Sequence, residues 1–153
     1  MKIPKISPKN VEKGQSLVEL AVGVLILILL LAGIIDLGRI LFYYISMRDA
    51  AQEAAVYGAI NPTKEYCPLI VERAKNAMGD RNVLVFIHIA DDLTGCGDAN
   101  QTTQACSGQQ IKVSVEKPDF PLTMPLIGAI IGSQTIALKA EISGTILRPA
   151  CGP

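Results

Sequence analysis

The chain has 153 residues, of which 50% are hydrophobic, and its 14 basic and 14 acidic side chains leave no formal net charge. A chain of this length holds one modest core beside a membrane segment. It shows no basic patch of the kind that binds nucleic acid, so we expect no nucleic-acid partner.

Residues 1–14 read MKIPKISPKNVEKG, with four lysines, one glutamate and two prolines, for a net charge of +3. They lack hydrophobic periodicity, which predicts a disordered basic leader. From residue 41 onward nine basic and eleven acidic side chains give −2. Because positive flanks of a membrane span stay in the cytoplasm, we expect a cytoplasmic N-terminus and an extracytoplasmic C-terminal domain.

An apolar run from Leu20 to Ile35 follows, and the sequence is again mostly apolar from Leu37 to Ile45. Roughly 20 apolar residues cross a bilayer core of about 30 Å. In lipid, a lone apolar segment must satisfy its backbone internally and is therefore helical. These residues predict one transmembrane helix, over about residues 18–42.

Three charged residues lie in or beside this span. Asp36 and Arg39 are three residues apart, so they share a helix face and are expected to form an ion pair near the outer boundary. Glu19 lies at the cytoplasmic edge without such a local partner. It pairs either with Lys13 or with a cation on another subunit.

Beyond Tyr44 the sequence is rich in alanine and lacks proline, so the helix is expected to continue over residues 15–60. Ala50, Ala54 and Gly58 fall on one face of it. Small residues four apart allow helices of different subunits to approach closely. The alternative is an alanine-rich helix packed on its own domain, and the sequence favours neither.

Residues 61–153 are expected to form an extracytoplasmic α+β domain with a second helix and an antiparallel sheet of about three strands. Asn61 and Pro62 end the first helix. The second helix begins at Thr63, Lys64 or Cys67 and runs to Met78, with Gly79 as its stop. Alternating or β-branched residues predict the strands at Asn82–Ala90, Ile111–Val115 and Thr135–Leu147.

The apolar stretch DFPLTMPLIGAIIGS, residues 119–133, separates the second and third predicted strands. It lacks the charges of a solvent-facing loop. A stretch of this kind marks a contact with a membrane or a partner, or else a loop folded over its own core.

Four cysteines fall in the predicted outer domain, where an even number suggests disulfides. Cys96 and Cys106 are the closest in sequence and would close a polar loop, which leaves Cys67 to pair with Cys151. The spacing does not separate the three possible connectivities. Four buried free thiols are the alternative, and a zinc site lacks any C-x-x-C pair.

No arrangement of residues indicates catalysis or a cofactor. The chain has one histidine, His88, and no nucleophile and base placed to act together. Asp91, Asp92 and Asp98 suit calcium in residue type, but their spacing does not fit a calcium-binding loop. We therefore expect no enzymatic activity, no cofactor and no metal.

Several segments together resemble a known family. KGQSLVEL, around Gly14, resembles the class III prepilin-type cleavage signal, with a basic leader, a glycine at the cut, a glutamate five residues later and an apolar helix. The chain is similar to TadE-like pilin-related proteins of the tight-adherence pilus system in the following segments: GQSLVEL, GIIDLGRILFY, DAAQEAAVYGA and IKVSVEKPDF, with the strand at the end.

The resemblance implies that an aspartyl prepilin peptidase cuts between Gly14 and Gln15, and that Gln15 is N-methylated. It implies that Glu19 sets the subunit register by binding the new N-terminal amine of a neighbouring subunit. The expected function is that of a pilin or minor pseudopilin in a type IV or Tad-like pilus, with other such subunits as partners. The alternative is an uncleaved, signal-anchored envelope protein whose outer domain binds a ligand or partner.

Overall fold

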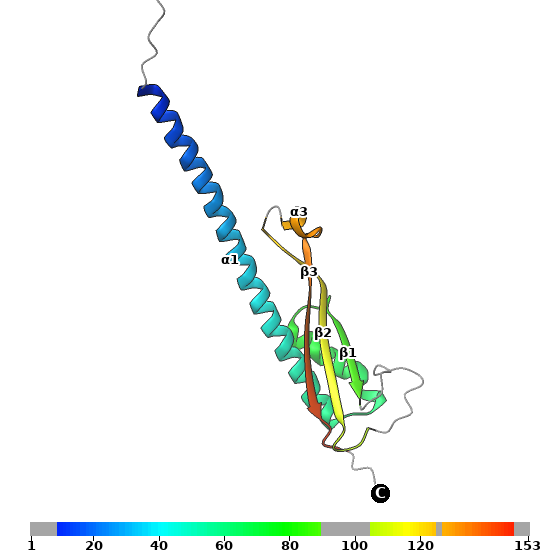
Figure 1. The fold of residues 1–153 in the computed structure, drawn as a ribbon. Helices are drawn as coiled ribbons and strands as arrows, with labels where there is room; N and C mark the ends of the chain where they lie inside the picture. The colour runs from blue at the N-terminus through cyan, green and yellow to red at the C-terminus, as the bar shows by residue number, and fades with distance from the viewer. Residues whose placement is uncertain (1–8, 90–104, 125–126, 149–153) are drawn as a thin grey trace, which may run out of the picture.

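A computed structural model describes residues 9–89, 105–124 and 127–148. Over these ranges the chain is a long N-terminal helix followed by a second helix and a three-stranded antiparallel sheet, so the predicted α+β class is confirmed. Figure 1 shows the first part of the long helix projecting away from the domain, and the second part packed against it.

The helix α1 spans Lys9–Ile60 and contains 52 residues. It ends where expected, before Asn61 and Pro62, and the Asn61 side chain and backbone N–H both donate to the Tyr57 carbonyl. The start differs from the expectation, because residues 9–13 of the predicted disordered leader are helical. No proline lies between Pro8 and Pro62, so nothing in the sequence breaks the helix before Gly14.

The second helix, α2, spans Cys67–Met78 and follows a short 3-10 turn, η1, at Lys64–Tyr66. Its start is the latest of the three expected positions because Pro68 is tolerated only in the first turn. Gly79 ends it in the left-handed conformation, with φ of 70°, and donates its N–H to the Lys75 carbonyl.

The sheet consists of β1 (Leu84–Ile89), β2 (Gln110–Pro121) and β3 (Thr135–Thr145), paired antiparallel in the order β1-β2-β3. The strand β2 is more than twice as long as the expected Ile111–Val115. It continues through an irregularity between Lys117 and Phe120 and then pairs Phe120 with Ile136. The β2–β3 hairpin therefore extends beyond the domain core.

The core lies between one face of the sheet and the C-terminal part of α1, with α2 beside it. Met47, Ile70, Ile111 and Val113 are completely buried in it. The small residues in this part of α1 are buried: Ala50, Ala51, Ala54, Ala55, Gly58 and Ala59. The sequence left open whether the alanine-rich face packs on another subunit or on its own domain. In the structure it packs on its own domain.

Gly58 shows how closely α1 approaches the sheet. A Cβ atom at this position would lie 2.4 Å from Cδ1 of Ile111 and 3.2 Å from Cδ1 of Ile70. Real Cβ atoms do not come as close to a neighbour as 2.4 Å, so any side chain here displaces the end of Ile111 and crowds Ile70.

Gly58→Val should therefore destabilise the domain by about 1–3 kcal/mol, as overpacking in a core does. The measurement is urea unfolding in detergent micelles, followed by circular dichroism. Gly38→Val is the matched control, because Gly38 lies in the same helix with nothing within 4 Å of its Cβ position. Equal midpoints for the two variants would contradict the close packing at Gly58.

Candidate functional site

The N-terminal part of α1, from Gly14 to Ile28, has only exposed residues and so presents apolar side chains on all sides. Between Leu17 and Ile45 the exposed large hydrophobic residues of α1 have accessibilities of 42–74%. One helix in the described residues, within Gly14–Ile60, is long and apolar enough to cross a membrane, with a mean hydropathy of 2.9 in an 18-residue window. The helix is compatible with a single-pass membrane protein.

The candidate processing motif lies at the start of this exposed region. Gly14 has open space around it, with nothing within 4 Å of its Cβ position. The Gln15 side chain donates a hydrogen bond of 3.2 Å to Glu19, one helical turn later. Glu19 thus has a neutral local partner, because a helix places residues four apart side by side. Its pairing with a charged group stays a prediction.

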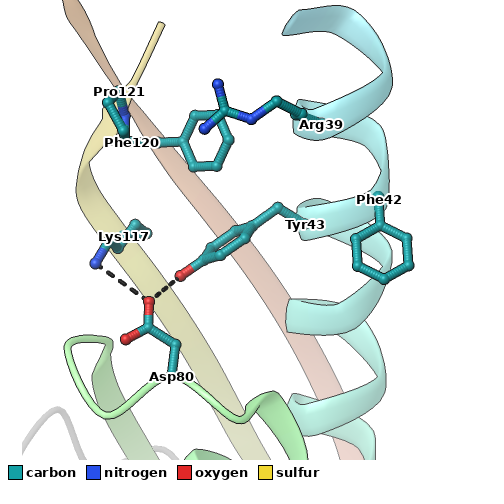
Figure 2. A pocket seen from close by; sticks show the side chains of 7 residues that line it. All are labelled: Arg39, Phe42, Tyr43, Asp80, Lys117, Phe120 and Pro121. Carbon is teal, nitrogen blue, oxygen red and sulfur yellow. Dashed lines mark hydrogen bonds and ion pairs between the residues drawn. The ribbon is translucent and has the colours of Figure 1, made fainter. Parts of the chain in front are cut away.

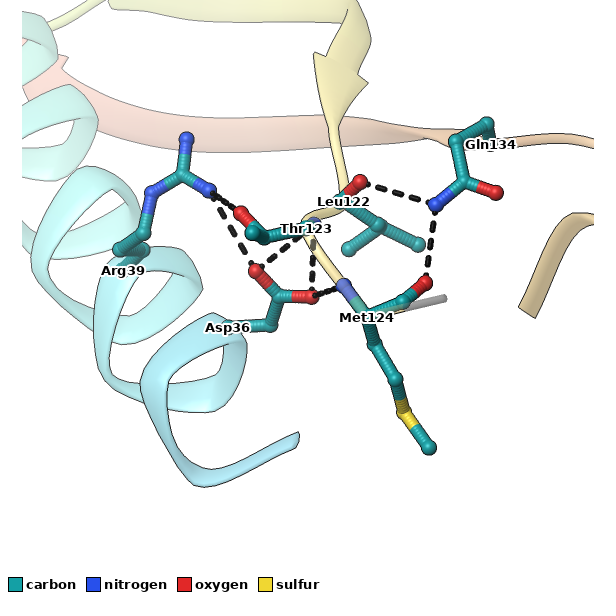
Figure 3. Close-up of polar contacts among 6 residues, drawn as sticks. All are labelled: Asp36, Arg39, Leu122, Thr123, Met124 and Gln134. Carbon is teal, nitrogen blue, oxygen red and sulfur yellow. Dashed lines mark hydrogen bonds and ion pairs between the residues drawn. The ribbon is translucent and has the colours of Figure 1, made fainter. Parts of the chain in front are cut away.

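Asp36 is the most connected polar side chain at the end of the apolar run, and it is only 5% exposed. The predicted ion pair exists, with 3.3 Å between Arg39 and Asp36. The shorter contacts come from the β2–β3 hairpin: the backbone N–H of Thr123 lies 2.8 Å and 2.9 Å from the two carboxylate oxygens, and that of Met124 lies 2.6 Å away. Figure 3 shows both donors pointing at the carboxylate.

Arg39 completes this arrangement, because it also donates to the hydroxyl of Thr123. A carboxylate near apolar surroundings is costly unless it is paired and hydrogen-bonded. The hairpin supplies the hydrogen-bond donors that the Asp36 carboxylate needs at this position on α1. Asp36 therefore attaches the hairpin to the helix. The name Asp36 clasp is used below for Asp36, Arg39, Thr123 and Met124.

A second polar cluster lies further along α1. The Tyr43 hydroxyl donates to Asp80, which follows α2, and Lys117 of β2 lies 3.2 Å from the same carboxylate oxygen. The other oxygen accepts the backbone N–H of Asn82 at 2.8 Å. Hydrogen bonds from Tyr43 and Asn82 lower the pKa of the Asp80 carboxyl, although its partial burial acts against them. The cluster joins three elements that are distant in sequence.

Aromatic contacts connect the two clusters. The rings of Tyr43 and Phe120 have centroids 5.0 Å apart, and the Arg39 guanidinium lies 5.3 Å from the centroid of Phe120. Together with Lys117, Asp80 and neighbouring residues they line an open cavity of about 330 Å³, seen in Figure 2. Sequence reasoning missed this cluster because 37 residues separate Tyr43 from Asp80.

The remaining predicted site residues lie in different places. Neither Cys67 nor Cys106 is a free thiol. Cys96 and Cys151 lie outside the described residues, so the pairing of the four cysteines stays a prediction. Asp91, Asp92 and Asp98 also lie outside them, and residues 9–89, 105–124 and 127–148 contain no group of three His, Cys, Asp or Glu placed to hold a metal.

Tyr43→Phe tests the second cluster, since it removes the hydroxyl and keeps the ring against Phe120. It should cost about 1 kcal/mol near neutral pH, the usual contribution of one such hydrogen bond, and raise the pKa of Asp80 toward its ordinary value. A carboxyl with a lowered folded-state pKa stabilises above its unfolded pKa, and this contribution is lost as pH falls through the folded value.

The difference between Tyr43→Phe and the unchanged chain should therefore be full above about pH 4 and shrink at lower pH. Denaturant unfolding over a series of pH values measures it. Tyr44→Phe, at an exposed neighbouring tyrosine, is the control. A pH-independent difference would show that the hydroxyl does not act through Asp80.

Comparison with known proteins bears on the helix that carries these residues. The family model of TadE-like proteins matches residues 14–56. No curated protein and no solved structure matches the chain. The matched residues begin at Gly14, include the exposed apolar part of α1 and Asp36, and end within the buried small residues. The resemblance inferred from the sequence is thus confirmed over residues 14–56, within the helix that carries the candidate site.

Proposed function

We propose that this chain is a structural pilin or minor pseudopilin of a type IV or Tad-like pilus, with no catalytic role. The TadE-like match supports a pilin-like protein associated with the Tad pilus. The observation that carries the proposal is the division of α1 into two parts. Its N-terminal part exposes apolar side chains all round, and its C-terminal part is buried in the domain.

A helix that is apolar on every side suits a bilayer or the centre of a helical assembly. The same surface therefore serves two states: it spans the membrane before assembly, and it packs against other pilin or pseudopilin subunits afterwards. In the membrane state the +3 leader is cytoplasmic and the sheet domain extracytoplasmic. In that oxidising compartment the four cysteines pair as Cys96 with Cys106 and Cys67 with Cys151.

Prepilin peptidase removes the leader between Gly14 and Gln15 in this proposal. Gly14 lies inside α1 in the uncleaved chain, and a protease needs an extended segment. Glycine lowers helix stability by roughly 0.5–1 kcal/mol relative to alanine, so Gly14 eases local unwinding near the N-terminal end of α1. The absence of a side chain also leaves room for the peptidase.

Mature protein from cells should begin at Gln15, and Gly14→Val should leave the leader attached. The measurement is the intact mass of the protein extracted from membranes. Gly23→Val is a matched control that should be processed normally, since Gly14 and Gly23 both have nothing within 4 Å of their Cβ positions. An intact Met1–Gly14 leader in the mature pool would instead favour the uncleaved, signal-anchored envelope protein.

Glu19 sets the register of subunits in this proposal. In the uncleaved chain its carboxylate accepts only a neutral donor, the amide of Gln15, among the described contacts. Cleavage creates an α-amine at Gln15, and a charged donor from a neighbouring subunit forms a stronger hydrogen bond than an amide does. Because the amine exists only after cleavage, unprocessed subunits lack this pairing.

Glu19→Ala should insert and be cleaved normally but be poorly incorporated into assemblies. Glu19→Gln, which keeps the shape and removes the charge, should show the same defect if the charge is what matters. The measurement is the fraction of processed protein recovered in sheared surface filaments or in crosslinked oligomers. Normal incorporation of both variants would refute the register role.

A further inference from the structure

We propose that the tip of the β2–β3 hairpin is a second membrane contact, which enters the outer leaflet beside α1. The hairpin tip is defined here as residues 122–124 and 127–134, which include the short helix α3 (Ile127–Ile131). This inference rests on the proposed function in one respect only, the crossing of a membrane by α1. It is independent of cleavage and of assembly.

The first observation is the position of the hairpin tip along α1. The Asp36 clasp attaches Thr123 and Met124 to the last turn of the apolar run. One turn earlier, the sulfur of Met124 lies 3.7 Å from the Cβ position of Gly33. Figure 1 shows α3 beyond the end of the domain core, level with the apolar part of α1. A membrane that surrounds this part of α1 therefore reaches the hairpin tip as well.

The second observation is the composition and exposure of this segment. The nineteen residues from Phe120 to Leu138 contain no Asp, Glu, Lys or Arg. In α3 no residue is buried, and Ile130 and Ile131 are 80% and 53% exposed. Two isoleucines held out from a small helix with no buried residue suit an apolar solvent better than water.

The third observation is the hydrogen bonding of the hairpin tip, shown in Figure 3. Gln134 donates from its side-chain amide to the carbonyls of Leu122 and Met124, and its own backbone carbonyl accepts the N–H of Leu122. The N–H groups of Thr123 and Met124 are both taken by Asp36.

Gln134 also accepts the N–H of Gly128 through its side-chain oxygen. A Cβ at Gly128 would lie 2.8 Å from that oxygen, so the glycine is what allows this contact. A loop in water needs no such internal partners, because water supplies them. A loop in a low-dielectric layer does, since each unsatisfied backbone group there costs several kcal/mol.

Charged side chains mark the depth at which the apolar layer ends. On α1 they resume at Asp36 and Arg39. On the sheet they resume at Asp119, whose side chain is 72% exposed, and at Lys139, which pairs with Glu116. Long basic side chains at such a boundary reach the lipid head groups. We place the hairpin tip on the hydrocarbon side of this boundary. Lipid therefore covers its exposed apolar side chains.

The absence of tryptophan from the chain makes a direct test possible. The full-length protein carrying Ile130→Trp is reconstituted into phosphatidylcholine vesicles with either ordinary or brominated acyl chains, and tryptophan emission is compared. Ile131→Trp provides a second reporter in case the first disturbs folding. Two matched positions serve as controls: Ile28→Trp in the apolar part of α1, 57% exposed, and Leu147→Trp at the far end of the domain, 65% exposed.

Brominated chains should quench the emission of the Ile130→Trp and Ile28→Trp variants severalfold and leave that of Leu147→Trp unchanged. Quenching in Ile28→Trp without quenching in either hairpin variant would overturn the proposal while leaving the membrane span intact. Blue-shifted but unquenched emission from Ile130→Trp would overturn it in favour of a second copy of the chain covering the hairpin tip. Failure to quench Ile28→Trp would instead refute the membrane span on which the inference rests.

Discussion

The structure depends on one uninterrupted helix that has two different surroundings. Up to Ile28, α1 exposes apolar side chains in all directions. From Gly33 one face is partly covered by the hairpin and the domain, and from Met47 onward its small residues are buried. No proline interrupts it between Pro8 and Pro62, so the change of surroundings occurs without a change of direction. A domain attached in this way has its orientation set by the helix that carries it, since a continuous helix bends only gently.

The polar contacts lie where the two surroundings meet. The Asp36 clasp and the Tyr43–Asp80–Lys117 cluster are two turns apart on α1, and Phe120 contacts both Arg39 and Tyr43. Asp36 cannot be left unpaired beside an apolar run, and backbone N–H groups at the end of the hairpin cannot be left without acceptors. Each group supplies what the other lacks, which explains why the hairpin extends so far beyond the core.

The sequence predicted the elements well and their long-range contacts poorly. The apolar run, the alanine-rich segment and the alternating strands each have a periodicity that determines local structure. The ion pair of Asp36 with Arg39 could be predicted because helix geometry fixes residues three apart. The contacts of Asp36 with Thr123 and Met124 could not, because the donors are backbone groups 87 and 88 residues away. A backbone N–H has no signature in the sequence, and the hairpin reaches Asp36 only because β2 continues past Val115.

The close approach of Gly144 on β3 to α1 has a mechanical consequence. A Cβ at Gly144 would lie 3.8 Å from the Ala55 carbonyl oxygen, so hairpin and helix are in contact there, and they meet again at Asp36. Nineteen residues of α1 separate these points, about 28 Å at 1.5 Å per residue. Helix and hairpin are thus attached to each other at two separate points, at Ala55 and at Asp36. A force across α1 is therefore shared between helix and hairpin. Tilting the domain relative to the apolar part of α1 requires breaking the Asp36 clasp.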